Sequence, residues 1–469
     1  MTQTSTMHDE IAAERQALDV VILAAGKGTR MRSQRPKVLH TLAGKPMVRH
    51  VMDVAERLRP ERLHVVVGHG AEQLREALRD TSARFALQAE QKGTGHAVAQ
   101  TLEQLGNGKV LILYGDVPLI RRDTLTALLA QVDDQHLGLL TVTLADPTGY
   151  GRILRNAAGE AIAIVEQKDA SPDELDVREC NTGIMAMTAT QLKRWLPRLS
   201  ADNAQGEYYL TDVIAMAAEE GIQVATAQPA TALEVEGVNN RAQMARLERA
   251  YQERLAQRLL EQGVALADPA RLDVRGQLNC GHDVEIDVGC VFEGEVELGE
   301  GVRIGPYCVI RNSTLGAGSV VESHSVIDGA VAAGRNQIGP FARLRPGTRL
   351  AIKAKVGNFV ETKNAEVGED SKINHLSYVG DARLGRGVNI GAGTITCNYD
   401  GINKHRTDIA DDAFIGSNSA LVAPVSIGRG ATVGAGSTIA KDVADNTLAV
   451  TRGRQVNKPD WPRPGKSDK

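Results

Sequence analysis

A glycine-rich turn followed by an arginine and a lysine is the first stretch of this chain that could do chemistry. The apolar run Val20–Leu23 leads into Ala24-Ala25-Gly26-Lys27-Gly28-Thr29-Arg30-Met31, and Pro36-Lys37 follows shortly after. Two glycines with small neighbours after a strand allow backbone N–H groups to face a polyphosphate. Arg30 adds a bidentate cation and Lys37 a second positive charge. A plain tight turn would contain the same glycines, so the cations carry the indication of phosphate binding.

The turn differs from the two common nucleotide-binding loops, and an acidic residue follows another apolar run. The turn lacks the Gly-Lys-Ser/Thr ending of a Walker A loop and the G-x-G-x-x-G of a dinucleotide fold. Asp116 comes just after the run Val110–Tyr114. Sites in parallel α/β sheets lie at the carboxyl ends of strands. Asp116 is therefore a candidate site residue, with a simple turn aspartate as the alternative.

A second polar stretch lies in the C-terminal half. The loop Thr396–Asp408 interrupts a regular repeat, and such interruptions often carry a site. His375 stands before it, two residues past the apolar Ile373. A lone histidine on a repeat is more often a surface or a satisfied histidine, so its residue type alone does not decide its role. Cys397 is not expected to be a nucleophile, because no histidine base accompanies it, and we expect a small buried thiol there.

Residues 18–240 have the pattern of an α/β domain that would position the first site. Short apolar runs alternate with amphipathic stretches such as Pro46–Leu58 and Thr94–Leu105. This alternation predicts a mostly parallel, Rossmann-like sheet covered on both faces. Residues 241–262 then predict one charged linker helix, which Asn239 or Asn240 can cap and which ends before Gly263.

From about residue 284 the pattern changes to a six-residue period. Apolar residues recur at this spacing along most of the remaining chain, beginning with Ile286, Phe292, Leu298, Ile304 and Ile310. Neither a helix nor an alternating strand has this period. It predicts a solenoid of short flat strands joined by tight turns, with the periodic residue pointing inward.

Composition and charge exclude several classes of function. The chain has 469 residues, 42% of them hydrophobic, and a formal net charge of −4, which argues against nucleic-acid or membrane-surface binding. No apolar run approaches the roughly 18 residues of a membrane helix, and the N-terminus has no apolar signal core, so we expect a cytoplasmic protein. The five cysteines form no Cys-x-x-Cys pair, so neither a zinc site nor a disulfide framework is expected.

The turn and later motifs together resemble the sugar-nucleotidyltransferase family. Besides Leu23–Met31 and Pro36-Lys37, the matching motifs are Gln88–Gln91, Gly93–Ala97, Tyr114–Asp116, Gly149–Ile153, Glu166, Asn181–Gly183 and Val238–Asn240. With the repeat behind them, residues 18–460 resemble the bifunctional N-acetylglucosamine-1-phosphate uridyltransferase/glucosamine-1-phosphate acetyltransferase family. The resemblance implies that the solenoid is a left-handed parallel β-helix of hexapeptide repeats.

For the N-terminal domain, the resemblance implies attack of a sugar phosphate on the α-phosphorus of UTP, with pyrophosphate leaving. Such a transfer needs charge neutralisation and alignment more than acid–base work. Arg30 and Lys37 would stabilise the phosphates, and Asp116 and Asn239 would hold Mg²⁺, which keeps waters and leans on substrate phosphates. The residues implied to bind UTP or the UDP-sugar are Leu23, Ala24, Gly26, Lys37, Gln88, Gly93, Thr94, Tyr114, Asp116, Gly151, Glu166, Asn181 and Asn239.

For the C-terminal domain, the resemblance implies acetyl transfer from acetyl-CoA to the amine of glucosamine 1-phosphate. The protonated amine must lose a proton before it attacks, and a base with a pKa near 7 suits that task, which makes His375 the implied base. The residues implied to bind glucosamine 1-phosphate are Arg345, Lys363, Tyr378 and Asn389. Those implied to bind acetyl-CoA are Ala392, Asn398, Tyr399, Ser417, Ala435 and Arg452. The family also implies a homotrimer with acetyl-CoA sites between neighbouring subunits.

We therefore expect five segments: a polar N-terminal extension (1–17), a uridylyltransferase domain (18–240), a linker helix (241–262), a β-helix acetyltransferase domain (263–452) and a C-terminal tail (453–469). One alternative is a nucleotidyltransferase whose solenoid is only a scaffold, but a scaffold needs neither His375 nor the Asn398-Tyr399 loop nor Arg452. The other is a binding protein in which both sites have decayed, but Arg30, Lys37, Asp116 and Asn239 are all present.

Overall fold

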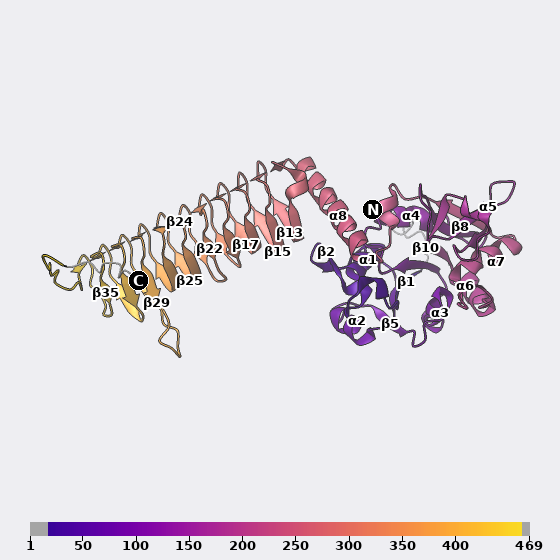
Figure 1. The fold of residues 1–469 in the computed structure, drawn as a ribbon, viewed down its shortest axis with the longest axis horizontal. Helices are drawn as coiled ribbons and strands as arrows, with labels where there is room; N and C mark the ends of the chain where they lie inside the picture. The colour runs from indigo at the N-terminus through magenta and orange to yellow at the C-terminus, as the bar shows by residue number, and fades with distance from the viewer. Residues whose placement is uncertain (1–16, 462–469) are drawn as a thin grey trace, which may run out of the picture. The chain divides into compact units, whose positions relative to one another are not determined.

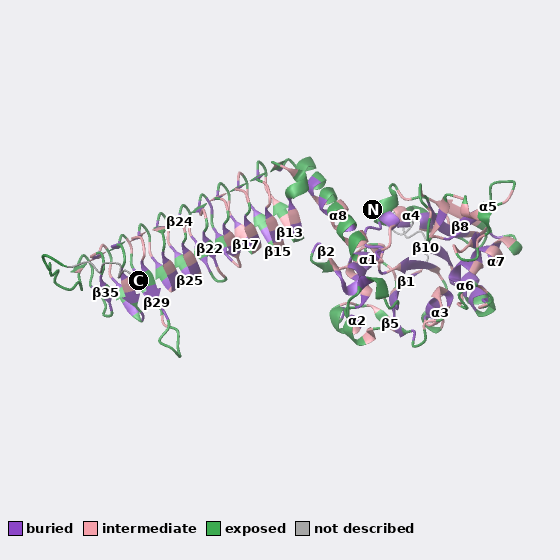
Figure 2. Cartoon of the chain, viewed as in Figure 1, coloured by how far each residue is buried: buried purple, intermediate pink, exposed green. Residues whose placement is uncertain are grey.

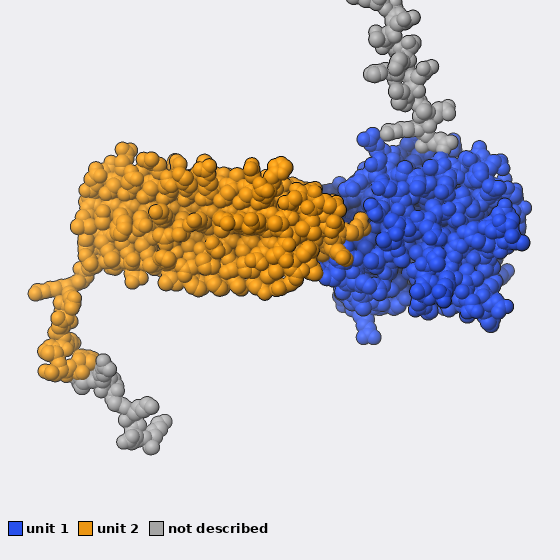
Figure 3. Space-filling view, turned by 90° about the horizontal axis from the view of Figure 1, so that it is seen from above, with its two compact units in different colours: residues 1–251 blue, residues 252–469 orange. Residues whose placement is uncertain are grey.

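The computed structural model of the chain describes residues 17–461. Within them the chain forms two compact units, which divide between Tyr251 and Gln252 (Figure 3). Almost all of the expected N-terminal extension, and residues 462–469 of the expected tail, lie outside the described residues.

The first unit is built on a mixed, mostly parallel sheet in the order β11-β7-β10-β6-β1-β4-β5. β10 runs antiparallel to both of its neighbours, and β8 and β9 form an antiparallel extension beside it. The strands are β1 Leu18–Ala24, β4 Arg62–Val67, β5 Arg84–Leu87, β6 Lys109–Tyr114, β7 His136–Thr143, β8 Arg152–Arg155, β9 Ala161–Val165, β10 Glu179–Thr188 and β11 Gln223–Ala227; a small hairpin pairs β2 Thr41–Leu42 with β3 Lys45–Pro46.

Helices cover both faces of this sheet, because successive side chains of a strand point to opposite faces. Val20 and Ile22 of β1 pack in one core with residues of α1, α2 and α4, whereas Val21 and Leu23 pack in another with residues of α3, α6 and α7. The helices are α1 Met47–Glu56, α2 Ala71–Ala77, α3 Thr94–Ala99, α4 Arg122–Ala130, α5 Pro172–Leu175, α6 Ala189–Trp195 and α7 Val213–Glu219. The 3₁₀ turns of this unit are η1 Thr29–Met31, η2 Lys37–Leu39, η3 Leu102–Gln104, η4 Leu196–Arg198, η5 Leu210–Asp212 and η6 Ala232–Val235; η7 Pro269–Arg271 belongs to the second unit. Figure 2 shows the buried central strands β1 and β10.

Helix α8 (Arg241–Glu261) crosses the division between the units (Figure 1). Asn240 caps its start, since its Oδ1 accepts a hydrogen bond from the Gln243 N–H at 2.9 Å. Gly263 follows its end with a φ of 89°, a conformation that glycine adopts without strain. Among the described residues, no helix combines the length and the apolarity that crossing a membrane requires.

The second unit is a solenoid of parallel strands, which is consistent with a left-handed β-helix. One sheet contains β12 Ala265–Leu266, β14 Glu285–Ile286, β16 Arg303–Ile304, β18 Val320–Val321, β21 Gln337–Ile338, β24 Lys355–Asn358, β26 Lys372–His375, β28 Asn389–Ile390, β31 Phe414–Ile415, β34 Thr432–Val433 and β36 Leu448–Ala449. The other contains β13 Asp273–Cys280, β15 Val291–Leu298, β17 Val309–Leu315, β19 Val326–Asp328, β20 Val331–Ala332, β22 Arg343–Leu344, β23 Arg349–Leu350, β25 Glu361–Val367, β27 Tyr378–Leu384, β29 Ile395–Cys397, β30 Thr407–Ile409, β32 Ala420–Val422, β33 Val425–Ile427 and β35 Thr438–Ile439.

The six-residue period is the spacing of the solenoid core. Periodic residues such as Ile286, Ile304 and Ile338 are buried in one continuous cluster along the unit. Each coil stacks on the next in register, so that Ile373 pairs with Val356 of the preceding coil and with Ile390 of the following one. The predicted fold class is therefore confirmed for both units.

One coil carries an insertion between β29 and β30. Tyr378 pairs with Ile395 in the next coil, whereas Ala382, four residues later, pairs with Thr407, so the extra residues lie between Cys397 and Thr407. The inserted residues project from the solenoid beside β29 (Figure 1). Cys397, predicted to be buried, is half-exposed where β29 gives way to this loop, so that prediction was wrong.

Candidate active sites

The glycine-rich turn brings the two expected cations of the first unit together. Gly28 adopts the left-handed conformation with a φ of 61°, and a Cβ on it would lie 2.6 Å from the Cβ of Lys37. Only a glycine permits this close approach of the two segments. As a result Arg30 on η1 and Lys37 on η2 point toward the same place, at the carboxyl end of β1.

A backbone hydrogen bond sets Asp116 and Asn239 side by side. Asp116 follows β6, which lies next to β1 in the sheet. Its carbonyl accepts a hydrogen bond from the Val238 N–H at 2.9 Å, which fixes the segment that leads into α8. The backbone N–H of Asn239 donates to Oε1 of Gln243 at 2.8 Å, so the start of the helix holds that residue as well. β4 and β6 flank β1, so the site lies where the strand order reverses, a common place for nucleotide sites.

The four side chains form one polar cluster. The ammonium group of Lys37 contacts Oδ2 of Asp116 in an ion pair whose side chains are each 15% exposed. The same ammonium donates to Oδ1 of Asn239 at 3.3 Å, and Nη2 of Arg30 donates to that oxygen at 2.9 Å. A carboxylate oxygen and an amide oxygen thus converge on a single cationic group.

This pair of oxygens has the chemistry of a sparse site for a divalent metal. Among residues 17–461 no cluster of three or more histidine, cysteine, aspartate or glutamate side chains is arranged for a metal. Mg²⁺ prefers oxygen ligands, and it is often held by one or two carboxylates together with substrate phosphates and water. Asp116 and Asn239 therefore suit a metal that arrives with a polyphosphate better than one held by protein ligands alone.

A cavity of about 310 Å³ opens beside this cluster. It is lined by Arg30, Tyr114, Asp116, Gly151, Glu166, Asn181 and Asn239, among others. Burial is the main cause that raises the pKa of the Glu166 carboxyl, and the Thr211 hydroxyl, which donates to it at 3.3 Å, opposes that shift. Burial also raises the pKa of the Tyr114 hydroxyl. The structure thus brings six of the expected UTP and UDP-sugar residues, together with the expected cation Arg30, to one cavity.

The other expected nucleotide residues lie around the turn and do not line this cavity. Leu23 and Ala24 are buried at the end of β1. Gly26 is exposed, and no heavy atom lies within 4 Å of the point that a Cβ on it would occupy. Gln88 is buried, and its amide donates to the Gly93 carbonyl at 3.0 Å. Oγ1 of Thr94 accepts from the Leu210 N–H at 3.1 Å. Gln91, not in the expected set, donates to the Ala25 carbonyl at 2.8 Å and so ties this group to the glycine-rich turn.

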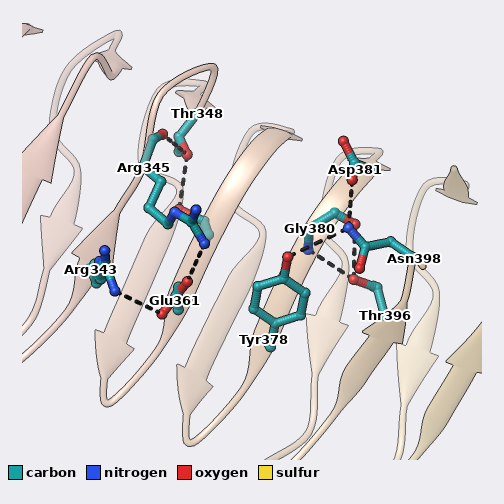
Figure 4. Close-up of polar contacts among 10 residues, drawn as sticks. Arg343, Arg345, Thr348, Glu361, Tyr378, Gly380, Asp381, Thr396 and Asn398 are labelled. Carbon is teal, nitrogen blue, oxygen red and sulfur yellow. Dashed lines mark hydrogen bonds and ion pairs between the residues drawn. The ribbon is translucent and has the colours of Figure 1, made fainter. Parts of the chain in front are cut away.

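In the second unit, an arginine and a glutamate form the first polar group on the outer surface of the solenoid. Nη1 of Arg345 donates to Oε1 of Glu361 at 2.8 Å, and Arg343 pairs with the other carboxylate oxygen at 3.6 Å (Figure 4). Glu361 was not among the expected site residues. Its position two residues before Lys363 on the same strand, where alternate side chains share a face, was the available signal.

Tyr378 and Asn398 meet one coil further along. Tyr378 folds over Gly380, where a Cβ would lie 2.3 Å from the tyrosine oxygen. The amide of Asn398 reaches the Tyr378 hydroxyl at 3.5 Å and contacts the Asp381 carboxylate more closely (Figure 4). Because Asn398 opens the inserted loop, these contacts anchor the loop to the surface that carries Arg345.

Lys363 lies next to a second lysine, Lys404, which the inserted loop supplies. The Lys404 ammonium, assisted by Arg345, holds the pKa of Lys363 below its ordinary value. A cavity of about 370 Å³ has the loop residues Lys404, His405 and Arg406 in its lining, together with Arg349, Glu366 and Asp381. Positive charges concentrated in this way favour an anionic group such as a sugar phosphate.

His375 and three expected acetyl-CoA residues form a column along one corner of the solenoid. His375, Ala392, Ser417 and Ala435 each stand two residues past an inward apolar residue of successive coils. Backbone bonds link the column: the N–H of Gly393 donates to the His375 carbonyl at 3.4 Å, and that of Asn418 to the Ala392 carbonyl at 2.7 Å. Coils repeat about every 4.8 Å, so the column could follow an extended ligand.

The remaining expected residues lie on the same coils. Asn389 begins β28, half-buried, in the coil after His375. Tyr399 is 60% exposed on the inserted loop, and Arg452 is exposed after β36. Within the single chain no hydrogen bond links His375 to Arg345, Lys363 or Tyr378 in the described residues.

Comparisons with known proteins cover both units. The description "MobA-like NTP transferase domain" matches residues 20–267. "GMPPB C-terminal domain" matches residues 274–367, and "Bacterial transferase hexapeptide (six repeats)" matches residues 406–441.

Curated relatives extend over nearly the whole chain. The chain is 72% identical over 450 residues to the bifunctional protein GlmU of Chromohalobacter salexigens, with 96% of this chain and 99% of the relative covered. It is 58% identical to the protein of the same name from Marinobacter nauticus, with 96% and 99% covered. It is 59% identical to that of Stutzerimonas stutzeri, with 96% and 100% covered.

Proposed function

Because the chain belongs to the family of bifunctional GlmU proteins, we propose that it makes UDP-N-acetylglucosamine in two steps at two sites. The first step transfers acetyl from acetyl-CoA to glucosamine 1-phosphate on the solenoid. The second transfers uridylyl from UTP to the resulting N-acetylglucosamine 1-phosphate in the α/β domain and releases pyrophosphate. The observation that carries this proposal is that one chain holds the Arg30, Lys37, Asp116 and Asn239 cluster in its first unit and, in its second, a solenoid that bears His375, Arg345 and Lys363.

Acetyl transfer needs a base, an anion site and a place for the thioester. The amine of glucosamine 1-phosphate gives a proton to His375 and attacks the thioester carbonyl. A C–N bond then forms, the C–S bond breaks, and the CoA sulfur leaves as a thiolate that takes a proton. Arg345 and Lys363 hold the sugar phosphate through charge-assisted hydrogen bonds. Tyr378 and Asn389 fix the sugar.

Acetyl-CoA lies along the corner column in this proposal. Ala392, Ser417 and Ala435 have small side chains, which leave room for the pantetheine arm beside the solenoid. Asn398 and Tyr399 on the inserted loop orient the acyl group, and Arg452 binds the CoA phosphates.

Uridylyl transfer depends on charge neutralisation and alignment. Arg30 and Lys37 stabilise the charge that develops as the sugar phosphate displaces pyrophosphate from the α-phosphorus. Gln88, Gly93 and Thr94 read the uracil, while Gly151, Glu166 and Asn181 hold the sugar in the cavity. Asp116 and Asn239 hold Mg²⁺, which, when bound, neutralises charge on the phosphates.

We further propose that the enzyme works in the cytoplasm as a homotrimer, with acetyl-CoA sites completed between neighbouring subunits. We also keep the expected domain limits, 18–240 and 263–452, joined by residues 241–262.

A single assay tests the proposed function. Purified protein is given glucosamine 1-phosphate, acetyl-CoA, UTP and Mg²⁺, and free thiol and pyrophosphate are followed separately. We expect both products, with pyrophosphate appearing only when acetyl-CoA is present. If pyrophosphate appears only from added N-acetylglucosamine 1-phosphate and no thiol is released, the solenoid is not an acetyltransferase.

A further inference from the structure

One ring nitrogen of His375 contacts a side chain of the preceding coil. Oδ1 of Asn358 lies 2.7 Å from Nδ1 of His375. The two residues pair directly, Asn358 on β24 and His375 on β26. Each stands two residues past an inward residue, Val356 and Ile373, so the stacking of coils brings the two side chains together.

We propose that Asn358 is a positioning residue that fixes the tautomer of His375 for acetyl transfer. This inference rests on the proposed function, in which His375 is the base. An amide oxygen only accepts hydrogen bonds, so the Nδ1 that faces it carries the hydrogen. In a neutral imidazole the other nitrogen, Nε2, is then the free acceptor and can take the proton of the substrate amine.

The position of Asn358 suits this role because Asn358 contacts Nδ1 of His375 and leaves Nε2 for the substrate amine. The acetyl-CoA column continues from His375 through Ala392 and Ser417, in the direction away from Asn358. Asn358 is half-buried, whereas His375 is exposed. The asparagine therefore holds one ring nitrogen from the side opposite to the expected thioester.

A neutral partner also leaves the ring in the uncharged form that the reaction needs. A carboxylate at this place would stabilise the imidazolium and keep the ring protonated at a higher pH. An amide orients the ring without adding a charge. Asparagine is therefore suited to orient a base that must be neutral near pH 7.

Three variants of the full chain test the proposal, with thiol release measured from glucosamine 1-phosphate and acetyl-CoA. Asn358→Ala removes the acceptor and should lower kcat about tenfold or more, with KM for both substrates nearly unchanged. The carboxylate introduced by Asn358→Asp can only accept a hydrogen bond, so this variant should keep most of its activity above pH 8. Because the carboxylate stabilises the protonated ring, the acidic limb of the kcat–pH profile should move to higher pH by about one unit. Asn279→Ala, an exposed asparagine on β13, is the matched control and should change neither quantity.

The outcomes separate this inference from the proposed function. Pyrophosphate release from N-acetylglucosamine 1-phosphate and UTP reports on folding and should stay constant in every variant. If His375→Ala abolishes thiol release while Asn358→Ala retains wild-type kcat, the positioning role is wrong and the proposed function stands. If Asn358→Asp is as inactive as Asn358→Ala at every pH, the amide donates to the ring instead, and the inference fails. Full thiol release by His375→Ala would overturn the proposed base itself.

Discussion

The ammonium group of Lys37 and the carboxylate of Asp116 form a partly buried ion pair at the carboxyl ends of two neighbouring strands. The amide oxygen of Asn239 completes the arrangement and also accepts from Arg30. Oxygens that suit a metal and cations that suit phosphate therefore lie in one cluster. This juxtaposition is the structural basis of the proposed uridylyl transfer.

Replacing the acidic member of this pair should remove one activity only. We expect Asp116→Ala to abolish pyrophosphate release from UTP and N-acetylglucosamine 1-phosphate, because the metal loses its carboxylate and Lys37 is left without its counter-charge. Thiol release should be unchanged. Asp80→Ala, whose side chain is 92% exposed, is the control. Loss of both activities in a folded protein would contradict two independent sites.

The converse change lies on the solenoid. His375→Ala should lower thiol release by about 10² to 10⁴-fold, the range for losing a general base. Pyrophosphate release from N-acetylglucosamine 1-phosphate should remain at the wild-type rate. Steady-state kinetics of the two half-reactions measure both effects, and unchanged acetylation would remove His375 from the mechanism.

Arg452 tests the proposed direction of the CoA arm. Losing a charge-assisted contact to phosphate costs about 1.5–3 kcal/mol, so Arg452→Ala should raise KM for acetyl-CoA about 10-fold or more while KM for UTP stays constant. Arg454→Ala, also exposed and two residues further on, is the matched control. A change in the KM for UTP instead would mean that the C-terminal segment serves the other site.

The lysine pair predicts a pH dependence. The Lys404 ammonium lowers the pKa of Lys363, so Lys363 loses its charge at a lower pH than an ordinary lysine, and binding of the sugar phosphate should weaken early on the alkaline side. Removing the neighbour raises the pKa of Lys363, and Lys404→Met should therefore move the alkaline rise of KM for glucosamine 1-phosphate to higher pH. The substrate amine titrates identically in both proteins, so the comparison isolates the lysine. An unchanged profile would show that Lys363 does not bind the phosphate.

The solenoid could be predicted in detail because one repeated physical requirement generates it. Every sixth residue must fill the same narrow core, and the buried positions of Ile286, Phe292 and Ile304 follow that spacing. The α/β sheet was predicted less completely. Neither β10, which carries a register shift between Asn181 and Met185, nor the short hairpin strands β8 and β9 were predicted as strands. The amphipathic stretch Thr94–Leu105 is an α-helix only to Ala99 and then forms a 3₁₀ turn.

The expected site residues were easier to identify than their partners. Arg30, Lys37 and Asp116 stand in recognisable motifs, and the sheet order brings them together. Glu361 and Asn358 contact Arg345 and His375 from other coils, 16 and 17 residues away in sequence. Only alignment of the repeats against each other, which places Asn358 and His375 at the same coil position, could have found the latter pair.

The most direct test of the account mixes two inactive variants. Asp116→Ala and His375→Ala proteins are each assayed for UDP-N-acetylglucosamine formation from glucosamine 1-phosphate, acetyl-CoA, UTP and Mg²⁺, alone and then together. We predict little product from either protein alone and restored synthesis from the mixture, because the acetylated intermediate can leave one protein and enter the other. If the mixture stays as inactive as its components while each protein keeps its remaining half-reaction, two separate sites joined by a diffusing intermediate are contradicted.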